Sequence, residues 1–224
     1  MGRRFAISDL HGCFETFKAL LHEICKFDRD DSLYLLGDLI DRGPNSRKLM
    51  DYIIDMINDG LDVHYVRGNH EQMLLDALHS DRDFVTWTIN GAKHTLNNFN
   101  VDRPRDIPKK YISFVQSSEF YIELNDYVLV HAGLNCEAPN PFSDRDSMMW
   151  TRHNHVDLIK TKGKPIVTGH TPHIYDEIVA SLRTNKIKID GGCVYRDKSR
   201  GMGLLVALEL NEKKLFSAPN IEDY

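Results

Sequence analysis

The sequence has no long hydrophobic run and few cysteines, and both shortages narrow the class of protein. The longest apolar stretch, GLLVALEL at 203–210, has the length of a strand, and the opening MGRRFAISDL lacks the apolar segment of a signal peptide. The four cysteines, Cys13, Cys25, Cys136 and Cys193, form no Cys-x-x-Cys pair, which argues against a disulfide framework or a thiolate zinc site. We therefore expect a cytoplasmic protein with free thiols and no membrane contact.

An excess of positive charge is also missing. The chain has 28 Lys and Arg against 33 Asp and Glu, and the net charge of -5 offers no general attraction to nucleic acid. Apolar residues make up 42% and charged residues 27%, which is typical of a folded globular protein, and 224 residues can bury a substantial core. No repeat, low-complexity segment or linker interrupts the chain, so we expect one domain over residues 1–224.

What the sequence does contain is an alternation of short apolar runs with amphipathic segments. Strand-like runs at 4–8, 32–36 and 62–67 alternate with helix-like segments at 15–25, 46–59 and 71–79. This order predicts an α/β core with helices packed against a sheet. Residues 80–118 are polar and predicted to be helical. The later runs are predicted strands, at 120–124, 127–131, 165–169, 177–182 and 186–190, followed by a hairpin over 203–218. The two halves should form one sandwich.

Polar side chains of the kinds that bind metals follow the predicted strands. They are Asp9 and His11, Asp38 and Asp41, Asn69 and His70, His131, and His170. Each alone is readily explained as a helix cap or turn residue. Because the carboxyl ends of strands build sites in open α/β sheets, however, all five strand ends can converge on one rim. The joint arrangement therefore indicates a functional site.

These motifs, in this order, resemble the phosphoprotein phosphatase branch of the metallophosphoesterases, bacterial and phage type. The matching motifs are Asp9-Leu-His11, Gly37-Asp38-Leu-Ile-Asp41-Arg42-Gly43, Gly68-Asn69-His70-Glu71, His131-Ala-Gly133 and Gly169-His170-Thr171. RGNHEQM at 67–73 and Trp150-Thr-Arg152 are similar to the lambda-like phage enzymes. The resemblance extends to about residue 195. It implies a calcineurin-like metallophosphoesterase domain, an α/β fold with a β-sandwich flanked by helices in four layers, α-β-β-α.

The resemblance also implies a centre with two divalent metal ions. One ion would be held by Asp9, His11 and Asp38, and the second by Asp38, Asn69, His131 and His170, with Asp38 bridging. Oxygen and imidazole ligands without thiolate suit Mn²⁺, Fe or Zn²⁺, and Mn²⁺ is the first choice from the bacterial and phage relatives. Two such ions activate a shared water, so that direct attack by a metal-bridging hydroxide requires no Cys or Ser nucleophile.

Four further residues are assigned to catalysis by the same resemblance. His70 would donate a proton to the leaving alkoxide, and Asp41 would accept the other ring N–H of His70 and favour its charged form. Arg42 and Arg152 would bind the phosphoryl group, because a guanidinium donates paired hydrogen bonds and keeps its charge. Glu71 is predicted to be a cap or supporting residue at the start of the next helix.

The leading interpretation is a serine/threonine protein phosphatase that acts on phosphorylated proteins or peptides. The alternative is a symmetrical bis(5'-nucleosyl)-tetraphosphatase that hydrolyses a dinucleoside polyphosphate, and a non-catalytic metal-binding scaffold is a distant third. A nuclease of the wider superfamily ranks below the other enzymes, and the sequence does not indicate an oligomeric state. A protein phosphatase needs an open cleft, whereas a dinucleotide hydrolase needs a pocket for a base. Residues 80–118 and 137–165 should distinguish the two.

Overall fold

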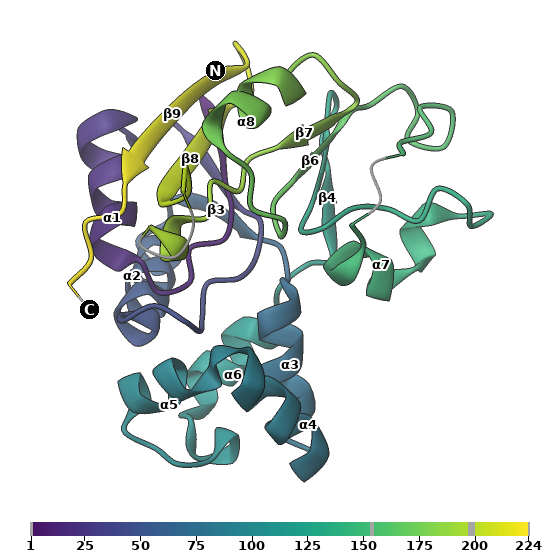
Figure 1. The fold of residues 1–224 in the computed structure, drawn as a ribbon. Helices are drawn as coiled ribbons and strands as arrows, with labels where there is room; N and C mark the ends of the chain where they lie inside the picture. The colour runs from purple at the N-terminus through teal and green to yellow at the C-terminus, as the bar shows by residue number, and fades with distance from the viewer. Residues whose placement is uncertain (1, 153–154, 197–199, 224) are drawn as a thin grey trace.

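Two β-sheets packed face to face form the centre of the protein (Figure 1). The computed structural model describes residues 2–152, 155–196 and 200–223. The first sheet has the order β3-β2-β1-β8-β9, and the second has the order β4-β5-β6-β7. The strands are β1 (Arg4–Ile7), β2 (Ser32–Leu35), β3 (Asp62–Tyr65), β4 (Tyr121–Glu123), β5 (Val128–Val130), β6 (Ile166–Thr168), β7 (Lys186–Lys188), β8 (Leu204–Glu209) and β9 (Lys214–Pro219).

Parallel pairing in the first sheet follows from the helices between its strands. β1, β2 and β3 are parallel neighbours, and a parallel connection needs a crossover long enough to hold a helix. The crossovers are α1 (Phe14–Lys18), which continues into the π-helix η1 (Ala19–Ile24), and α2 (Ser46–Asn58). The predicted hairpin forms as β8 and β9, and β8 pairs antiparallel to β1. The two ends of the chain therefore meet in one sheet.

Alternate side chains of each inner strand enter different cores. Phe5 and Ile7 of β1 face the core beneath the helices, whereas Ala6 faces the core between the sheets. In β5, Leu129 lies between the sheets while Val128 and Val130 pack on the outer face. Side chains of a strand point to opposite faces in turn, so these runs must be apolar throughout to bury both faces. This burial explains why the predicted strands are continuous apolar runs.

The outer face of the second sheet is covered by α7 (Arg145–Trp150), through Met148. The 3-10 turn η4 (Pro141–Ser143) packs against this face through Phe142, whereas η5 (Cys193–Tyr195) packs in the core of the first sheet. The fold is thus a mixed α/β fold with two sheets flanked by helices, as the sequence predicts. None of the helices in the described ranges is both long and apolar enough to cross a lipid bilayer.

Residues 69–116 form a helical insert at one end of the sandwich (Figure 1). It consists of α3 (Asn69–Ala77), α4 (Asp81–Trp87), η2 (Thr88–Ala92), α5 (Lys93–Phe99), η3 (Pro104–Asp106) and α6 (Lys109–Gln116). Trp87, Phe99 and Tyr111 are buried in the same core as the first sheet. The insert is therefore continuous with the sandwich core and can position groups at the sheet edge.

The predicted strand over 177–182 is wrong, because residues 177–181 lie in α8 (Tyr175–Ser181) and Leu182 is the C-cap of this helix. Its apolar residues fit both periods over so short a window. Ile178 and Ser181 are buried three residues apart while Val179 is exposed, which is the pattern of a helix with one face inward. Asp176 and Glu177 in the first turn also favour the helix N-terminus over a strand.

Candidate metal centre

The strand ends converge as the sequence predicts, and their backbone is unusual. Six non-glycine residues at these ends have positive φ angles: Asp9 at 48°, His11 at 43°, Asp38 at 51°, Asp41 at 72°, Arg42 at 66° and His170 at 67°. Left-handed backbone is unfavourable for residues with a Cβ and persists only where the surroundings impose it. This concentration of strain marks the sheet edge as a functional site.

One group of ligand atoms joins the second sheet to α3. His131 Nε2 lies 3.0 Å from Asn69 Oδ1 and 3.2 Å from His170 Nδ1, and these last two atoms are 2.9 Å apart. His131 Nδ1 donates to the Leu36 carbonyl at 2.6 Å, so that Nε2 carries the lone pair of the neutral ring. Metal bonds of about 2.1 Å at right angles separate neighbouring ligands by about 3 Å. The three atoms therefore have the spacing of a coordination shell.

A second group lies on the side of the first sheet. His11, Asp38 and His70 each place a ligand atom within 4.8 Å of the others, and Asp38 also groups with His131 and His170. His11 Nδ1 faces the Ile40 carbonyl at 2.8 Å, so its Nε2 carries the lone pair. Asp38 Oδ2 is 3.7 Å from His11 Nε2 and 3.5 Å from His131 Nε2. Asp38 thus stands between the two groups, as a bridging ligand would.

Asp9 lies beside these two groups without being a member of either. Its Oδ2 accepts hydrogen bonds from the Ser8 hydroxyl and from the His170 N–H, the latter at 2.9 Å. In this arrangement His70, rather than Asp9, completes the group with His11 and Asp38. A Cβ on Gly169 would overlap the Ser8 hydroxyl and the Asp9 carboxylate. Glycine at 169 therefore permits this close packing, and the role of Asp9 as a ligand stays a prediction.

His70 and Asp41 form the expected hydrogen-bonded pair, and burial acts on the pKa of both groups. His70 Nδ1 donates to Asp41 Oδ2 at 2.6 Å, and both side chains are fully buried. The family resemblance predicts that Asp41 favours the charged form of His70. Burial, reinforced by the charge of Arg42, instead lowers the pKa of His70 well below its usual value. Burial also raises the pKa of Asp41 to about 7.

The helical insert holds Asp41 and Arg42 in place. Trp87 Nε1 donates to Asp41 at 2.7 Å and the Thr95 hydroxyl donates at 2.6 Å. The carbonyl of Gly91 accepts the Arg42 N–H at 3.3 Å. Glu71 accepts from the N–H groups of Asp38, Leu39 and Gly68, at 2.8, 2.8 and 3.0 Å, which confirms its predicted supporting role. The insert therefore orients residues that lie at the end of β2.

Burial sets the charge of the remaining predicted ligands. It raises the pKa of Asp38 well above the usual value, with Asp9 and Glu71 adding to the effect. It lowers the pKa of His11, and it lowers that of His170 to about 2. Neutral imidazoles and crowded carboxylates at one point favour a bound cation. His70 Nε2 and His170 Nε2 are also buried without a hydrogen-bond partner in the described ranges. These donors fit a divalent metal.

Both predicted phosphate arginines face this centre. Arg42 Nη1 is 2.7 Å from His11 Nε2, and its guanidinium lies 5.6 Å from the centre of the Tyr195 ring. Arg152 is exposed, its Nη1 is 3.4 Å from the Thr171 hydroxyl, and its charge contributes to the low pKa of His170. The two guanidinium groups thus lie near the centre, one after β2 and the other after α7.

One buried acid at the centre was not predicted. Asp190 follows β7, accepts the Gly192 N–H at 2.8 Å and is almost fully buried. Burial raises its pKa well above the usual value, and the nearby charge of Asp9 raises it further. The sequence contains a signal for Asp190, because this residue ends the predicted strand 186–190 and the other predicted site residues also lie at strand ends.

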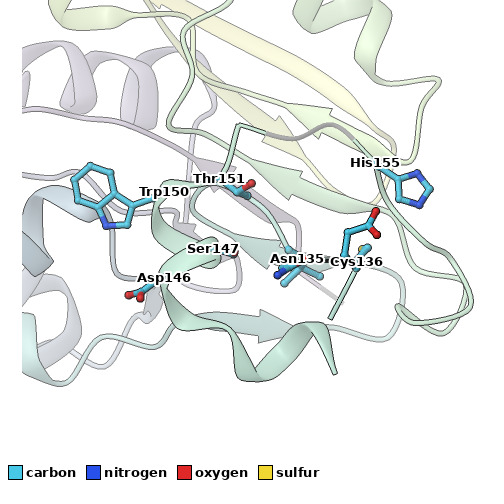
Figure 2. Close-up of a pocket in the computed structure, with 9 residues that line it drawn as sticks. Asn135, Cys136, Asp146, Ser147, Trp150, Thr151 and His155 are labelled. Carbon is cyan, nitrogen blue, oxygen red and sulfur yellow. Dashed lines mark hydrogen bonds between the residues drawn. The ribbon is translucent and has the colours of Figure 1, made fainter. Parts of the chain in front are cut away.

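A cavity of about 430 Å³ lies beside the centre, between α7 and the loop at 134–137. Figure 2 shows Trp150 and Asp146 on one side of it and Cys136 and His155 on the other. Trp150 is 44% exposed, and its ring lies 6.3 Å from that of His170. The volume of the cavity is in the range of small-molecule sites, about 300–1,000 Å³. The segment 137–165, together with residues 134–136, therefore lines a pocket near the predicted ligand His170.

Comparison with known proteins places this geometry in a family. The profile of the Calcineurin-like phosphoesterase family matches residues 3–195. An asymmetrical bis(5'-nucleosyl)-tetraphosphatase of Oceanobacillus iheyensis is 23% identical over 97% of this chain and 92% of its own length. Serine/threonine-protein phosphatase 1 of Salmonella typhimurium is 41% identical, over 39% of this chain and 38% of its own. A solved serine/threonine phosphatase from Saccharomyces cerevisiae, 15% identical, superposes with a TM-score of 0.68 over 100% of this chain and 81% of its own. The chain belongs to the calcineurin-like phosphoesterase family.

Proposed function

We propose that this metallophosphoesterase hydrolyses dinucleoside tetraphosphates. The observation that carries the substrate class is the cavity beside the centre, since a base needs a pocket where a polypeptide needs an open cleft. Glu137 and Asp146 line it, and carboxylates repel phosphate but accept hydrogen bonds from the amino groups of a base. The exposed indole of Trp150 offers a face on which a base can stack. The relative that matches nearly full length supports the same class.

Two divalent ions, with Mn²⁺ first, are proposed for the centre. Asp9, His11 and Asp38 would hold one, and Asp38, Asn69, His131 and His170 would hold the other. When bound, such ions polarise the phosphoryl group and activate water at neutral pH. Arg42 and Arg152 would bind and orient the phosphoryl oxygens through charge-assisted hydrogen bonds. Asp41 fixes the ring of His70, so that His70 Nε2 is the atom that would hold or release a proton at the reacting group.

The test of this role depends on the leaving group. A phosphoanhydride leaves as a weakly basic phosphate, whereas a phosphoserine leaves as a strongly basic alkoxide that must be protonated. Replacing His70 by Asn should therefore reduce kcat on an alkyl phosphate more than on diadenosine tetraphosphate. Equal losses on both substrates would remove the general-acid role.

Protein phosphatase activity is the second candidate. The segment shared with the Salmonella typhimurium phosphatase supports it, as do the lambda-like motifs, but that similarity covers a minor part of the chain. Both activities use the same ligands and arginines. They differ in what the neighbouring surface admits, and the cavity favours the nucleotide.

The deciding experiment supplies the Mn²⁺-loaded protein with diadenosine tetraphosphate and, separately, with a phosphothreonine peptide. We expect the higher kcat/KM on the nucleotide. Products identify the bond cleaved, because ATP with AMP means asymmetrical and ADP alone means symmetrical hydrolysis. ATP with AMP is the expected result, because the Oceanobacillus iheyensis relative is an asymmetrical enzyme. This result would replace our prediction of symmetrical hydrolysis. A higher kcat/KM on the peptide would overturn the proposal, and no turnover with both metals bound would favour the scaffold interpretation.

A further inference from the structure

A smaller cavity of about 60 Å³ lies next to His170, since Gly169 and Thr171 line it. It sits on the outer face of the second sheet, at the ends of β6 and β7. It is lined by Arg152, Thr168, Gly169, Thr171, His173, Lys186 and Lys188. Gly169 and Thr171 flank His170 in the chain. Arg152 lines this cavity and is also one of the two arginines predicted to bind phosphate at the metal centre. The cavity, here named the cationic pocket, therefore opens beside the metal centre.

Strand register explains why its lysines face the same way. β6 and β7 are parallel, with Thr168 opposite Lys188 and Ile166 opposite Lys186. Val167 and Ile187, between them, enter the core between the sheets. Because side chains alternate along a strand, Lys186, Lys188 and Thr168 must all point to the outer face. The pocket is thus a consequence of the pairing of two strands.

The charged side chains that line the cationic pocket are positive. Lys186, Lys188 and Arg152 line it, and none of its lining residues in the described ranges is acidic. Lys186 is buried, and burial together with the charge of Lys188 lowers its pKa to about 8. The positive charges of Lys186 and Arg152 also contribute to the lowered pKa of His170. Three cations that line one small cavity create a positive potential there, which favours an anionic ligand.

The hydroxyl of Thr168 supplies a second and independent observation. Thr168 is only 1% exposed, it lines the pocket, and its Oγ1 has no hydrogen-bond partner among the described residues. Leaving a buried hydroxyl unpaired costs about 1–3 kcal/mol, so such groups are rare unless a ligand completes them. A hydroxyl that can donate, among cations that can donate, fits an anionic oxygen.

We propose that the cationic pocket binds a second phosphoryl group of the substrate, next to the one held at the metal centre. The proposal rests on the proposed function and extends it to the polyphosphate chain. A phosphomonoester has one phosphoryl group and would leave the pocket unused, whereas a tetraphosphate has further groups within reach. The pocket would therefore be a determinant of specificity, with Arg152 shared between the two positions.

Binding is tested first, on the metal-free protein, by calorimetric titration with inorganic tripolyphosphate. Lys188→Met and Thr168→Val should each weaken binding, the first about tenfold, because a hydrogen bond to a charged group is lost. Lys48→Met, which removes the same charge from an exposed position on α2, is the control and should leave the dissociation constant unchanged. The pocket is excluded if the wild type does not bind tripolyphosphate, or if all three variants bind as the wild type does.

Kinetics then separate this inference from the proposed function. In the Mn²⁺-loaded protein, Lys188→Met should lower kcat/KM for diadenosine tetraphosphate about tenfold and leave that for p-nitrophenyl phosphate unchanged. Equal loss on both substrates would overturn the specificity role. If the wild type fails to cleave diadenosine tetraphosphate, the proposed function falls, and the tripolyphosphate titration still decides whether the pocket is an anion site.

Discussion

At the scale of the residue, two buried threonines differ in whether their hydroxyl is paired. Thr95 exchanges hydrogen bonds with Asp41, at 2.6 and 2.9 Å, whereas Thr168 Oγ1 has no partner in the described part of the chain. Valine has the same shape without the hydroxyl. Thr95→Val should lower the free energy of unfolding by about 1–3 kcal/mol, and Thr168→Val should raise it or leave it unchanged. Urea unfolding of the metal-free variants measures both. A loss of stability in Thr168→Val would show that its hydroxyl is paired.

Lys186 gives a prediction of pH dependence. Burial and Lys188 lower its pKa from 10.5 to about 8, so between these values the unfolded chain binds more protons than the folded one. Stability should therefore rise with pH across the window from about 8 to about 10.5, and below pH 8 the buried charge lowers stability. Lys186→Met should unfold at higher urea concentration than the wild type at pH 7.5, and the difference should shrink by pH 10. A difference constant across this window would contradict the shifted pKa.

At the scale of the element, the helical insert acts on the centre through Gly91. Gly91 has a φ of +116°, and a Cβ there would lie 2.9 Å from Arg42 Cγ. Gly91→Ala should displace Arg42 and lower kcat/KM for any phosphoester substrate, about tenfold or more, because positioning errors near 1 Å are costly.

Gly60→Ala is the matched control for the insert. Gly60 follows α2 with a φ of +78°, and a Cβ there meets nothing within 4 Å. Both variants carry the backbone penalty of about 1 kcal/mol for alanine in left-handed geometry. Only Gly91→Ala should change activity. If both variants lose activity equally, backbone strain rather than contact with Arg42 is responsible.

At the scale of the whole molecule, the predicted metal ligands come from both sheets. His11 and Asp38 follow strands of the first sheet, and His131 and His170 follow strands of the second. A metal ion that bridges them should therefore stabilise the sandwich as a unit. Adding Mn²⁺ to about 100 times its dissociation constant contributes about 2.7 kcal/mol, which corresponds to roughly 5–10 °C in Tm for a chain of this size.

The variants for this measurement differ by one atom from the native acids. Asp38→Asn should lose most of the rise in Tm, because Asp38 belongs to both ligand groups. Asp55→Asn, at an exposed position of α2, should keep the full rise. A full rise in Asp38→Asn would mean that the metal binds elsewhere.

Much of the fold follows from sequence, because it depends on local pattern. The apolar runs of β1, β2 and β5 are long enough and flanked sharply enough to be recognised, and the polar residues after them must lie at the strand ends. Asp38, His131 and His170 were found in this way. The segment 177–182 failed because six residues fit both a strand and one turn and a half of helix, and only contact of Ile178 with the core distinguishes them.

What the sequence determined by itself is the order of the strands along the chain and the residue types at their ends, since both are local properties. Only the tertiary structure decided which groups are buried together and therefore how they are charged. The low pKa of His70, the support of Asp41 by Trp87 and the meeting of Arg152 with Lys188 all join segments far apart in the chain. Desolvation and Coulomb interaction depend on distance in space, which no local pattern contains.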